Sequence, residues 1–318
     1  MNDSRKYPWG DDLPYNSAAE RLKERFGGRM QKLSLSAGFS CPNRDGRVGT
    51  GGCTFCNNEA FVPFYTHHKD IDVQIEEGLG FLRERYPRSA RFVAYFQAYT
   101  NTYGDFDAIK ALYSRVLSHP GIGGIVIGTR PDCVDGPMLD FFAELAKDHF
   151  VSVEYGVESV YDDVLLRVNR GHGYAASVRA IEMSAERGLH TGAHFMFGLT
   201  DPGREMDSAG RINALPLSSV KFHQLQIIRC TTLEKEWEQG AGEFHLFDRE
   251  EYEEFIIAVL ERLRPDLSVE RFISETPPRY RRAPDWGLQW RVPEVRREII
   301  AKMKSSGRWQ GRLFLVNS

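Results

Sequence analysis

The sequence has no run of 18 apolar residues, so no segment of it stays apolar for long enough to cross a membrane as a helix. Its first 15 residues are polar and lack the apolar core of a secretory signal peptide. Neither a repeat with a solenoid period nor a low-complexity stretch occurs along the 318 residues. These absences predict a cytoplasmic globular protein, and the 42% hydrophobic and 27% charged residues have the balance of one.

Cysteine is scarce, with five residues in the whole chain, which is an odd number. Five cysteines without an export signal argue against a disulfide framework. Cys41, Cys53 and Cys56 nevertheless fall within sixteen positions, and such clustering in a reducing compartment indicates a metal site. We expect Cys133 and Cys230 to be small buried residues rather than ligands.

The net charge is only −3, which by itself indicates no particular partner. The charge is unevenly distributed, because residues 279–318 carry ten Lys and Arg against three acidic residues. This tail is therefore +7 and the rest of the chain −10. A basic stretch from Arg279 to Arg312 can attract tRNA or another RNA, although a solvated helix face explains the same charges.

Short β-rich runs alternate with longer segments of helical spacing. Between residues 71 and 85, for example, Ile71, Ile75, Leu79 and Leu82 recur at the spacing of one helix face. The runs that predict strands are 32–36, 91–95, 124–127, 150–155, 194–197 and 220–228, with a further short strand within 268–274. The segments that predict helices are 71–85, 106–117, 137–147, 174–187, 204–215, 249–263 and 293–305.

Regular alternation of strand and helix predicts parallel pairing with right-handed crossovers. Six such units form a partial, open (β/α)6 barrel of the TIM type, because eight units are needed for closure. We therefore expect an α/β protein with a polar N-terminal extension over residues 1–29, a barrel core over 30–235 and an α/β C-terminal extension over 236–318.

The three clustered cysteines stand in a glycine-rich loop directly after the first predicted strand. Eleven residues separate Cys41 from Cys53, and two separate Cys53 from Cys56. Thiolates are soft ligands that suit iron–sulfur clusters, zinc or Cu(I), and three of them leave one iron of a four-iron cluster open. A structural zinc ion would need a fourth ligand, for which His67 or His68 is available. The glycines, the aromatic Phe55 and the position of the loop at the mouth of a barrel favour the cluster.

Five segments make the chain similar to a known family. They are residues 38–46 (GFSCPNRDG), 51–57 (GGCTFCN), 95–102 (YFQAYTNT), 128–134 (GTRPDCV) and 169–172 (NRGH). The sequence resembles the YhcC-type branch of the radical SAM superfamily, which is related to the catalytic subunit of the elongator complex. The resemblance covers residues 28–240 strongly and the tail weakly, and this branch has the long cysteine spacing found here.

The resemblance implies that Cys41, Cys53 and Cys56 hold a [4Fe–4S] cluster whose open iron binds S-adenosylmethionine (SAM). An external one-electron reductant then drives cleavage of SAM to a 5′-deoxyadenosyl radical, which abstracts hydrogen from the substrate. The cofactors supply the difficult chemistry, and the protein binds, orients and excludes water. The elongator relative acts on tRNA, so RNA modification is one hypothesis for an otherwise unidentified substrate.

The resemblance also implies contacts to SAM. The chain lacks the Gly-Gly-Glu type motif that usually binds the SAM amino group, so Gln97, Tyr99 and Thr100 are expected in its place. Arg130 can bind a carboxylate of SAM or substrate, or form an ion pair with Asp132 or Glu154 instead.

Further along the chain, Glu154 and Glu158 suit the ribose hydroxyls of SAM, and Arg170 resembles the family position that contacts its carboxylate. The adenine is expected against Phe197 and Gly198, where the turn is two residues longer than the family pattern Gly-Leu-Pro-Gly-Glu.

On the sixth predicted strand, Lys221, His223 and Gln226 are the candidates for touching substrate. Two other functions remain open at this point. A non-enzymatic RNA-binding protein with structural zinc would be colourless, and a cluster protein for electron transfer would not cleave SAM.

Overall fold

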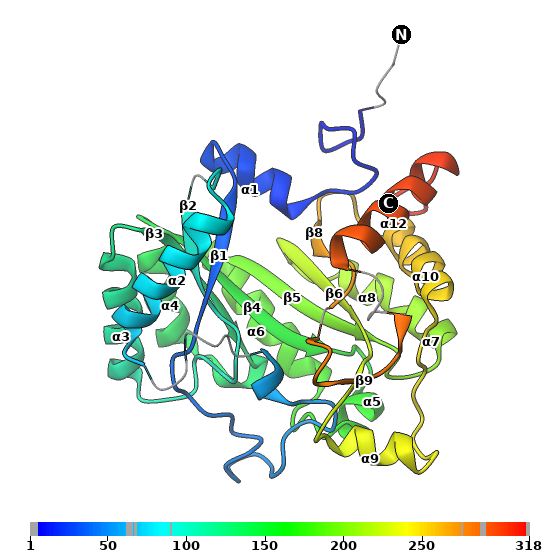
Figure 1. Cartoon of the computed structure of the whole chain (residues 1–318), viewed down its shortest axis with the longest axis horizontal. Helices are drawn as coiled ribbons and strands as arrows, with labels where there is room; N and C mark the ends of the chain where they lie inside the picture. Colours follow the sequence, from blue (N-terminus) through cyan, green and yellow to red (C-terminus); the bar gives the residue numbers. More distant parts are fainter. Residues whose placement is uncertain are drawn as a thin grey trace.

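The computed structural model describes residues 6–61, 66, 69–89, 91–274, 276–286 and 291–315. One sheet of seven parallel strands dominates it, and the strands are hydrogen-bonded in chain order (Figure 1). They are β1 (Met30–Leu35), β2 (Arg91–Phe96), β3 (Ile122–Thr129), β4 (Phe150–Glu158), β5 (His190–Phe197), β6 (Ser219–Gln224) and β8 (Ser268–Arg271). Within the described part of the chain, no helix has the length and apolar character needed to span a membrane.

The sheet is curled into an open half-barrel. Strands β1 and β8 lie at opposite ends of the strand order, yet Lys32 Nζ on β1 is 2.8 Å from Glu270 Oε2 on β8. The two edges are therefore close enough for one ion pair to bridge them. The predicted α/β partial barrel is confirmed.

Helices follow the strands, as the alternating pattern predicts. Asp70, Asp105, Asp135 and Asp248 each accept a backbone N–H at a helix N-terminus, which satisfies groups that the helix itself cannot pair. The α-helices are α1 (Ala18–Phe26), α2 (Ile71–Arg85), α3 (Phe106–Ser118), α4 (Gly136–Leu145), α5 (Asp162–Arg167), α6 (Tyr174–Glu186), α7 (Pro202–Met206), α8 (Ser208–Asn213), α9 (Thr232–Glu238), α10 (Arg249–Arg262) and α12 (Val292–Ser305).

Three predicted elements differ from the structure. The strand expected over 220–228 divides into β6 and β7 (Ile227–Ile228), and β7 leaves the main sheet to pair with β9 (Arg281–Ala283). The helix expected over 204–215 is two short helices, α7 and α8. The short strand expected within 268–274 is β8, which pairs with β6 and extends the six-stranded sheet to seven.

The segment after residue 235 shares the core of the barrel. Tyr252, Ile256 and Leu260 of α10 are buried in the same apolar cluster as Leu33 of β1, and α12 adds Ile299 to it. Figure 1 shows α10 and α12 beside the sheet near β8. The C-terminal segment is thus packed into the barrel rather than set apart from it.

Acidic residues neutralise part of the basic tail, where five of the ten basic side chains form ion pairs within the described residues. Lys302 pairs with Glu253 at 2.8 Å, and both Arg308 and Arg312 pair with Glu261 on the same helix, α10. Arg282 pairs with Glu234 and Glu238 of α9, and Lys304 with Asp12. Half of the ten basic side chains therefore hold the C-terminal segment to the protein.

Candidate functional site

The cysteine loop lies directly after β1 and is folded back on itself. The Gly52 amide donates to the Asn43 carbonyl at 2.8 Å, and Cys56 N donates to Cys53 O at 3.0 Å. Gly51 and Gly52 have φ of 81° and 80°, which glycine adopts without strain. The Asn169 side chain donates to the Gly52 carbonyl at 2.8 Å and so ties the loop to the segment after α5.

Basic and amide groups surround the cysteine sulfurs. Arg170 Nη1 is 3.5 Å from Cys53 Sγ, and Asn43 Nδ2 is 3.8 Å from the same atom. Burial, together with the neighbouring Cys53, raises the pKa of Cys56 to about 11. The charge and hydrogen bond of Arg44 act in the opposite direction and lower this pKa. The loop therefore supplies three thiols and donors that can stabilise a bound thiolate.

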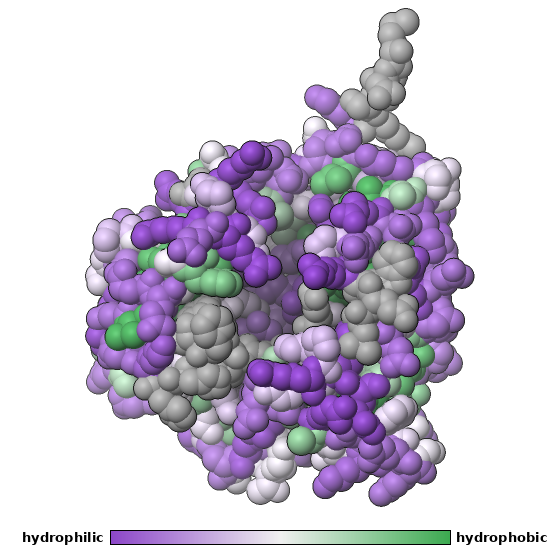
Figure 2. Space-filling model, viewed as in Figure 1, coloured by the Kyte–Doolittle hydropathy of each residue, from purple (hydrophilic) through white to green (hydrophobic). Residues whose placement is uncertain are grey.

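The thiols open onto a cavity of about 300 Å³ inside the half-barrel. A hollow lined with hydrophilic residues is visible on this face of the molecule (Figure 2). The cavity wall includes eleven of the thirteen predicted cluster and SAM residues, together with Arg44, which lies in the cysteine loop. The eleven are Cys41, Cys53, Cys56, Phe55, Gln97, Tyr99, Thr100, Arg130, Glu154, Glu158 and Arg170.

The turn after β2 positions the candidates for the SAM amino group. Tyr99 has a positive φ of 64°, and the Thr100 amide donates to the Ser40 carbonyl next to the cysteine loop. The Thr100 hydroxyl is buried and has no hydrogen-bond partner within the described residues. It is thus available to a bound molecule.

Arg130 forms the ion pair with Asp132, which was one of the alternatives that the sequence left open. Its Nε and Nη2 donate to the two carboxylate oxygens of Asp132 at 2.9 and 2.8 Å. Burial favours the neutral acid, but the hydrogen bond and charge of Arg130 prevail and lower the pKa of Asp132. The third nitrogen of Arg130, Nη1, is buried and unpaired in the described structure.

Arg170 is also buried, and it binds within the protein. Nη2 donates to the Gly156 carbonyl, Nη1 approaches Cys53, and Nε has no partner among the described residues. A Cβ at Gly156 would lie 2.8 Å from Arg170 Nη2, so glycine in β4 gives the guanidinium its space. Unpaired nitrogens of Arg130 and Arg170 therefore occur at the same cavity.

The two candidate ribose ligands differ in their surroundings. Glu154 forms ion pairs with Lys32 and Lys221, whereas Glu158 forms none with the residues that the structure describes. Burial raises the pKa of Glu158, and Arg170 and Arg271 act against that increase.

Phe197 and Gly198 do not line the cavity. Phe197 is in the apolar core, stacked on Phe222 at 5.4 Å. The Gly198 amide donates to Glu205 Oε2 at 2.7 Å, and its carbonyl accepts from His245 N at 2.8 Å. The backbone groups expected to face adenine have partners in the protein, so that contact stays a prediction. The β5 residues that line the cavity are His194 and Met196.

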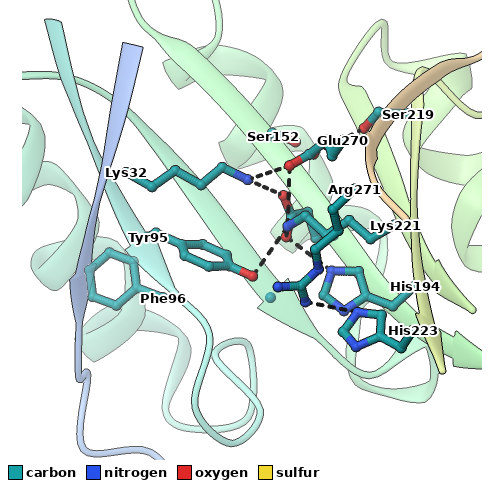
Figure 3. A network of polar contacts seen from close by, with 12 residues as sticks. Lys32, Tyr95, Phe96, Ser152, His194, Ser219, Lys221, His223, Glu270 and Arg271 are labelled. Atoms are coloured by element: carbon teal, nitrogen blue, oxygen red, sulfur yellow. Dashed lines mark hydrogen bonds and ion pairs between the residues drawn. The ribbon is translucent and has the colours of Figure 1, made fainter. Parts of the chain in front are cut away.

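A network of charged side chains crosses the interior of the half-barrel (Figure 3). Glu154 accepts from Lys32 at 2.8 Å, from Lys221 and from His194 at 3.1 Å. Lys221 also donates to Tyr95 Oη at 3.2 Å. Despite burial, which acts the other way, Lys221 and Lys32 keep the pKa of Glu154 well below its usual value.

The network contains two substrate candidates and several residues that the sequence did not suggest. Lys221 is buried against Glu154, while His223 and Gln226 reach the cavity. Lys32, Glu270 and Arg271 were missed. Alternation could not have placed both Glu270 and Arg271 in the interior, because adjacent residues of a regular strand point to opposite faces. The pairing of β6 with β8 has a register shift at this point.

The two remaining cysteines are less buried than expected. Cys230 is exposed and Cys133 is partly exposed. Cys230 stands in the turn after β7 with φ of 63°, so it packs against little of the core. The expectation that both are buried is wrong.

Burial of His194 predicts a pH-dependent stability. Burial and the nearby Lys221 lower its pKa to about 4, whereas an unfolded histidine titrates near 6.5. Between these values only the unfolded chain takes up the proton, so the free energy of unfolding is fully retained above about pH 6.5 and falls toward pH 4. His194→Gln should reduce the dependence of the unfolding free energy on pH in this range by up to about 1.4 kcal/mol per pH unit. Urea unfolding of both proteins at pH 4.5–7 measures it, and identical slopes would contradict the assignment.

The donor set fits a cluster better than a single ion. No group of three His, Cys, Asp or Glu side chains that could hold one metal ion occurs in the described ranges. The candidate zinc ligands His67 and His68 lie outside these ranges. Three thiols on one loop, facing a cavity with unpaired polar atoms, suit a larger cluster with a cofactor beside it.

Comparison with protein families gives two matches. The model of the radical SAM superfamily matches residues 44–208, and that of the radical SAM C-terminal domain matches residues 217–304. The second begins just before β6, so it includes the last two strands of the sheet.

Two similar relatives are full-length matches. Protein YhcC of Escherichia coli K12 is 32% identical over 92% of this chain and 88% of its own. The uncharacterized protein YtqA of Bacillus subtilis is 29% identical over 99% and 97%. Among solved structures, the Elp3 of Methanocaldococcus infernus has a TM-score of 0.64 at 15% identity, covering 88% of this chain and 64% of that one. This last likeness is one of fold.

Proposed function

The chain belongs to the radical SAM superfamily, and from this premise we propose that Cys41, Cys53 and Cys56 bind a [4Fe–4S] cluster with SAM in the adjoining cavity. Membership identifies it as a radical SAM enzyme, and the family implies both cofactors. One observation carries the assignment to this site: the three thiols open onto a cavity where Thr100, Arg130 and Arg170 have unpaired polar atoms.

When bound, the reduced cluster supplies the electron that cleaves SAM to methionine and the 5′-deoxyadenosyl radical. The protein contributes position and charge. Arg170 and Asn43 direct N–H donors at the Cys53 sulfur, where they would hydrogen-bond a cluster ligand. Because the loop and the ends of β2 to β4 are tied by hydrogen bonds, the site is held in place before SAM arrives.

The SAM molecule has three polar parts to bind. Its carboxylate suits the unpaired nitrogens of Arg130 and Arg170, and its amino group suits Thr100 Oγ1 with Gln97 and Tyr99. Glu158 is the better candidate for the ribose hydroxyls, because Glu154 is engaged by two lysines. Phe55 lies in the same wall next to the cysteines.

The RNA hypothesis rests on the elongator resemblance and on the basic tail. Five of the ten basic residues in the tail are paired with acids, so the tail offers RNA less free charge than its sequence indicates. We therefore leave tail-bound RNA out of the proposal. The electron is proposed to come from an external one-electron reductant.

The experiment is anaerobic reconstitution with iron and sulfide, followed by reduction with dithionite in the presence of SAM. We expect 5′-deoxyadenosine and methionine in equal amounts by mass spectrometry. Protein with four irons and a reducible cluster that forms neither product would refute the proposal.

The role of Arg130 gives a prediction about SAM affinity. Arg130→Lys keeps a positive charge but removes the planar fork, so one charged hydrogen bond to SAM is lost, worth about 1.5–3 kcal/mol. The Kd for SAM should rise about tenfold to hundredfold with iron content unchanged. Arg187→Lys is the matched control, since Arg187 forms a surface ion pair with Asp140. Equal Kd values in all three proteins would remove Arg130 from the SAM site.

A further inference from the structure

The cavity that holds the cysteines also contains a cation that has no acidic partner in the part of the chain that the structure describes. Two carboxylates, Glu154 and Glu270, lie in the interior network, and two lysines serve both of them. Lys32 is 2.8 Å from each carboxylate, and Lys221 contacts Glu154 and stands 3.5 Å from Glu270. These four charges cancel.

Arg271 is the fifth charge of this network, and no carboxylate of the described residues forms an ion pair with it. Its Nη2 lies 2.8 Å from Nε2 of His223, and its Nε is buried without a partner in the described ranges. Burial and the charge of Arg271 lower the pKa of His223 well below its usual value, so the imidazole is a neutral acceptor. The Arg271 side chain lines the cavity.

The other acids at the cavity have cations of their own. Asp132 accepts hydrogen bonds from Nε and Nη2 of Arg130. Burial raises the pKa of Glu158, and the charges of Arg170 and, to a smaller extent, Arg271 act against that increase without forming an ion pair with it in the described residues. At the end of β8 the cavity wall therefore carries a guanidinium that forms no ion pair within the described residues.

The guanidinium is also held in one orientation. His223 is stacked on His194 with ring centroids 5.4 Å apart, and His194 is hydrogen-bonded to Glu154 at 3.1 Å. On the same side, Gln224 forms two hydrogen bonds with the backbone of Ser274, which fixes the segment just after β8. Figure 3 shows Arg271 beside His223 and His194 in the interior. A fixed guanidinium binds a carboxylate or phosphate through two parallel hydrogen bonds.

We propose that the substrate carries an oxyanion, a carboxylate or a phosphate, that docks on Arg271 beside His223 and fixes the substrate in the cavity. This inference rests on the proposed function, because it takes the cavity as the place where substrate meets SAM. Arg271 acts here as a binding and specificity residue. The proposal involves no covalent step at Arg271.

Binding of small oxyanions tests the proposal without any turnover. Sodium acetate and inorganic phosphate are titrated separately by calorimetry into the full-length reconstituted protein in chloride-free buffer. We expect one saturable site for at least one of them. Arg271→Gln should weaken it about tenfold or more, and Arg271→Lys, which keeps the charge but not the fork, should weaken it less. The lysine variant supplies the result if the glutamine variant fails to fold.

Arg187→Gln is the control, because Arg187 pairs with Asp140 on the surface. Acetate binding alone identifies a carboxylate substrate, phosphate binding alone a phosphate, and both identify an oxyanion site of either kind. No binding of either probe, or equal affinity in wild type and Arg271→Gln, overturns the proposal. The proposal is also overturned if Arg130→Lys weakens binding of the anion and Arg271→Gln does not. That result would place the anion at the SAM site.

The proposed function can fail separately. Absence of 5′-deoxyadenosine from the wild-type protein would refute SAM cleavage even if the oxyanion site exists. An oxyanion site that is missing from a protein that cleaves SAM would refute only the inference about the substrate.

Discussion

Cys53→Ala abolishes the iron–sulfur cluster, so iron in anaerobically reconstituted protein falls from about four atoms per chain to near zero. The same result is expected for Cys41→Ala and Cys56→Ala, because three thiolates are the full protein ligand set and two cannot retain a four-iron cube. Iron and sulfide assays, with the visible absorption spectrum, measure the loss.

The chain contains its own matched controls for this experiment. Cys230 is exposed in the turn after β7, and Cys133 stands after β3, bonded weakly to Asp132. Cys230→Ala and Cys133→Ala should keep the full iron content. Four irons in any variant of the trio, or loss of iron in a control, would contradict the ligand assignment.

Glu154→Ala is expected to cost the largest amount of stability among single substitutions in the barrel interior. It leaves Lys221, which is 6% exposed at its side chain, without its closest carboxylate, and it leaves Lys32 with Glu270 alone. Removing one partner of a buried ion pair costs about 3–5 kcal/mol, because the remaining charge stays buried. Urea unfolding at pH 7 measures the change in the free energy of unfolding.

The pH dependence of this loss follows from the sign of the shift. The folded pKa of Glu154 is depressed, so its stabilisation is present above the unfolded value of about 4.3 and is lost only as pH falls through the lower folded value. The deficit of Glu154→Ala should therefore be constant between pH 5 and 8. The control is Glu144→Ala, whose exposed pair with Lys147 is worth about 0–1 kcal/mol. Similar losses in the two variants would show that the interior network adds no stability.

Sequence periodicity was sufficient for most of the fold. The first five strands and the long helices α2, α3, α6, α10 and α12 occur where the alternating and helical patterns predict them. The failures have local causes. Strand β8 was expected only as a short strand of the C-terminal extension, and its four residues give little sign that it joins the main sheet. The chain turns at Leu225, whose amide donates to the Phe197 carbonyl, so β6 and β7 separate.

Site residues that belong to short sequence motifs could be predicted. Site residues that come together only because the sheet curves could not. The cysteine loop and the residues at the ends of β2 to β4 follow from short segments. The interior network joins Lys32 to Glu154, 122 positions away, and to Glu270, 238 positions away. Such partners become neighbours only when β1 and β8 approach each other.

For the basic tail, contacts between distant segments removed a feature that the sequence predicted. Its sequence has an excess of positive charge, but Glu253, Glu254 and Glu261 on α10 face it across the packed helices. Net charge along a segment therefore overstated the charge available to a partner.

The account depends on one iron of the cluster having no protein ligand, so that SAM can bind to it. Electron–nuclear double resonance of the reduced protein with SAM labelled by ¹⁵N in its amino group and ¹⁷O in its carboxylate tests this directly. We predict hyperfine coupling of the cluster to both labels. A cluster that shows neither coupling at saturating SAM, with a fourth protein side chain on the iron, would contradict the account.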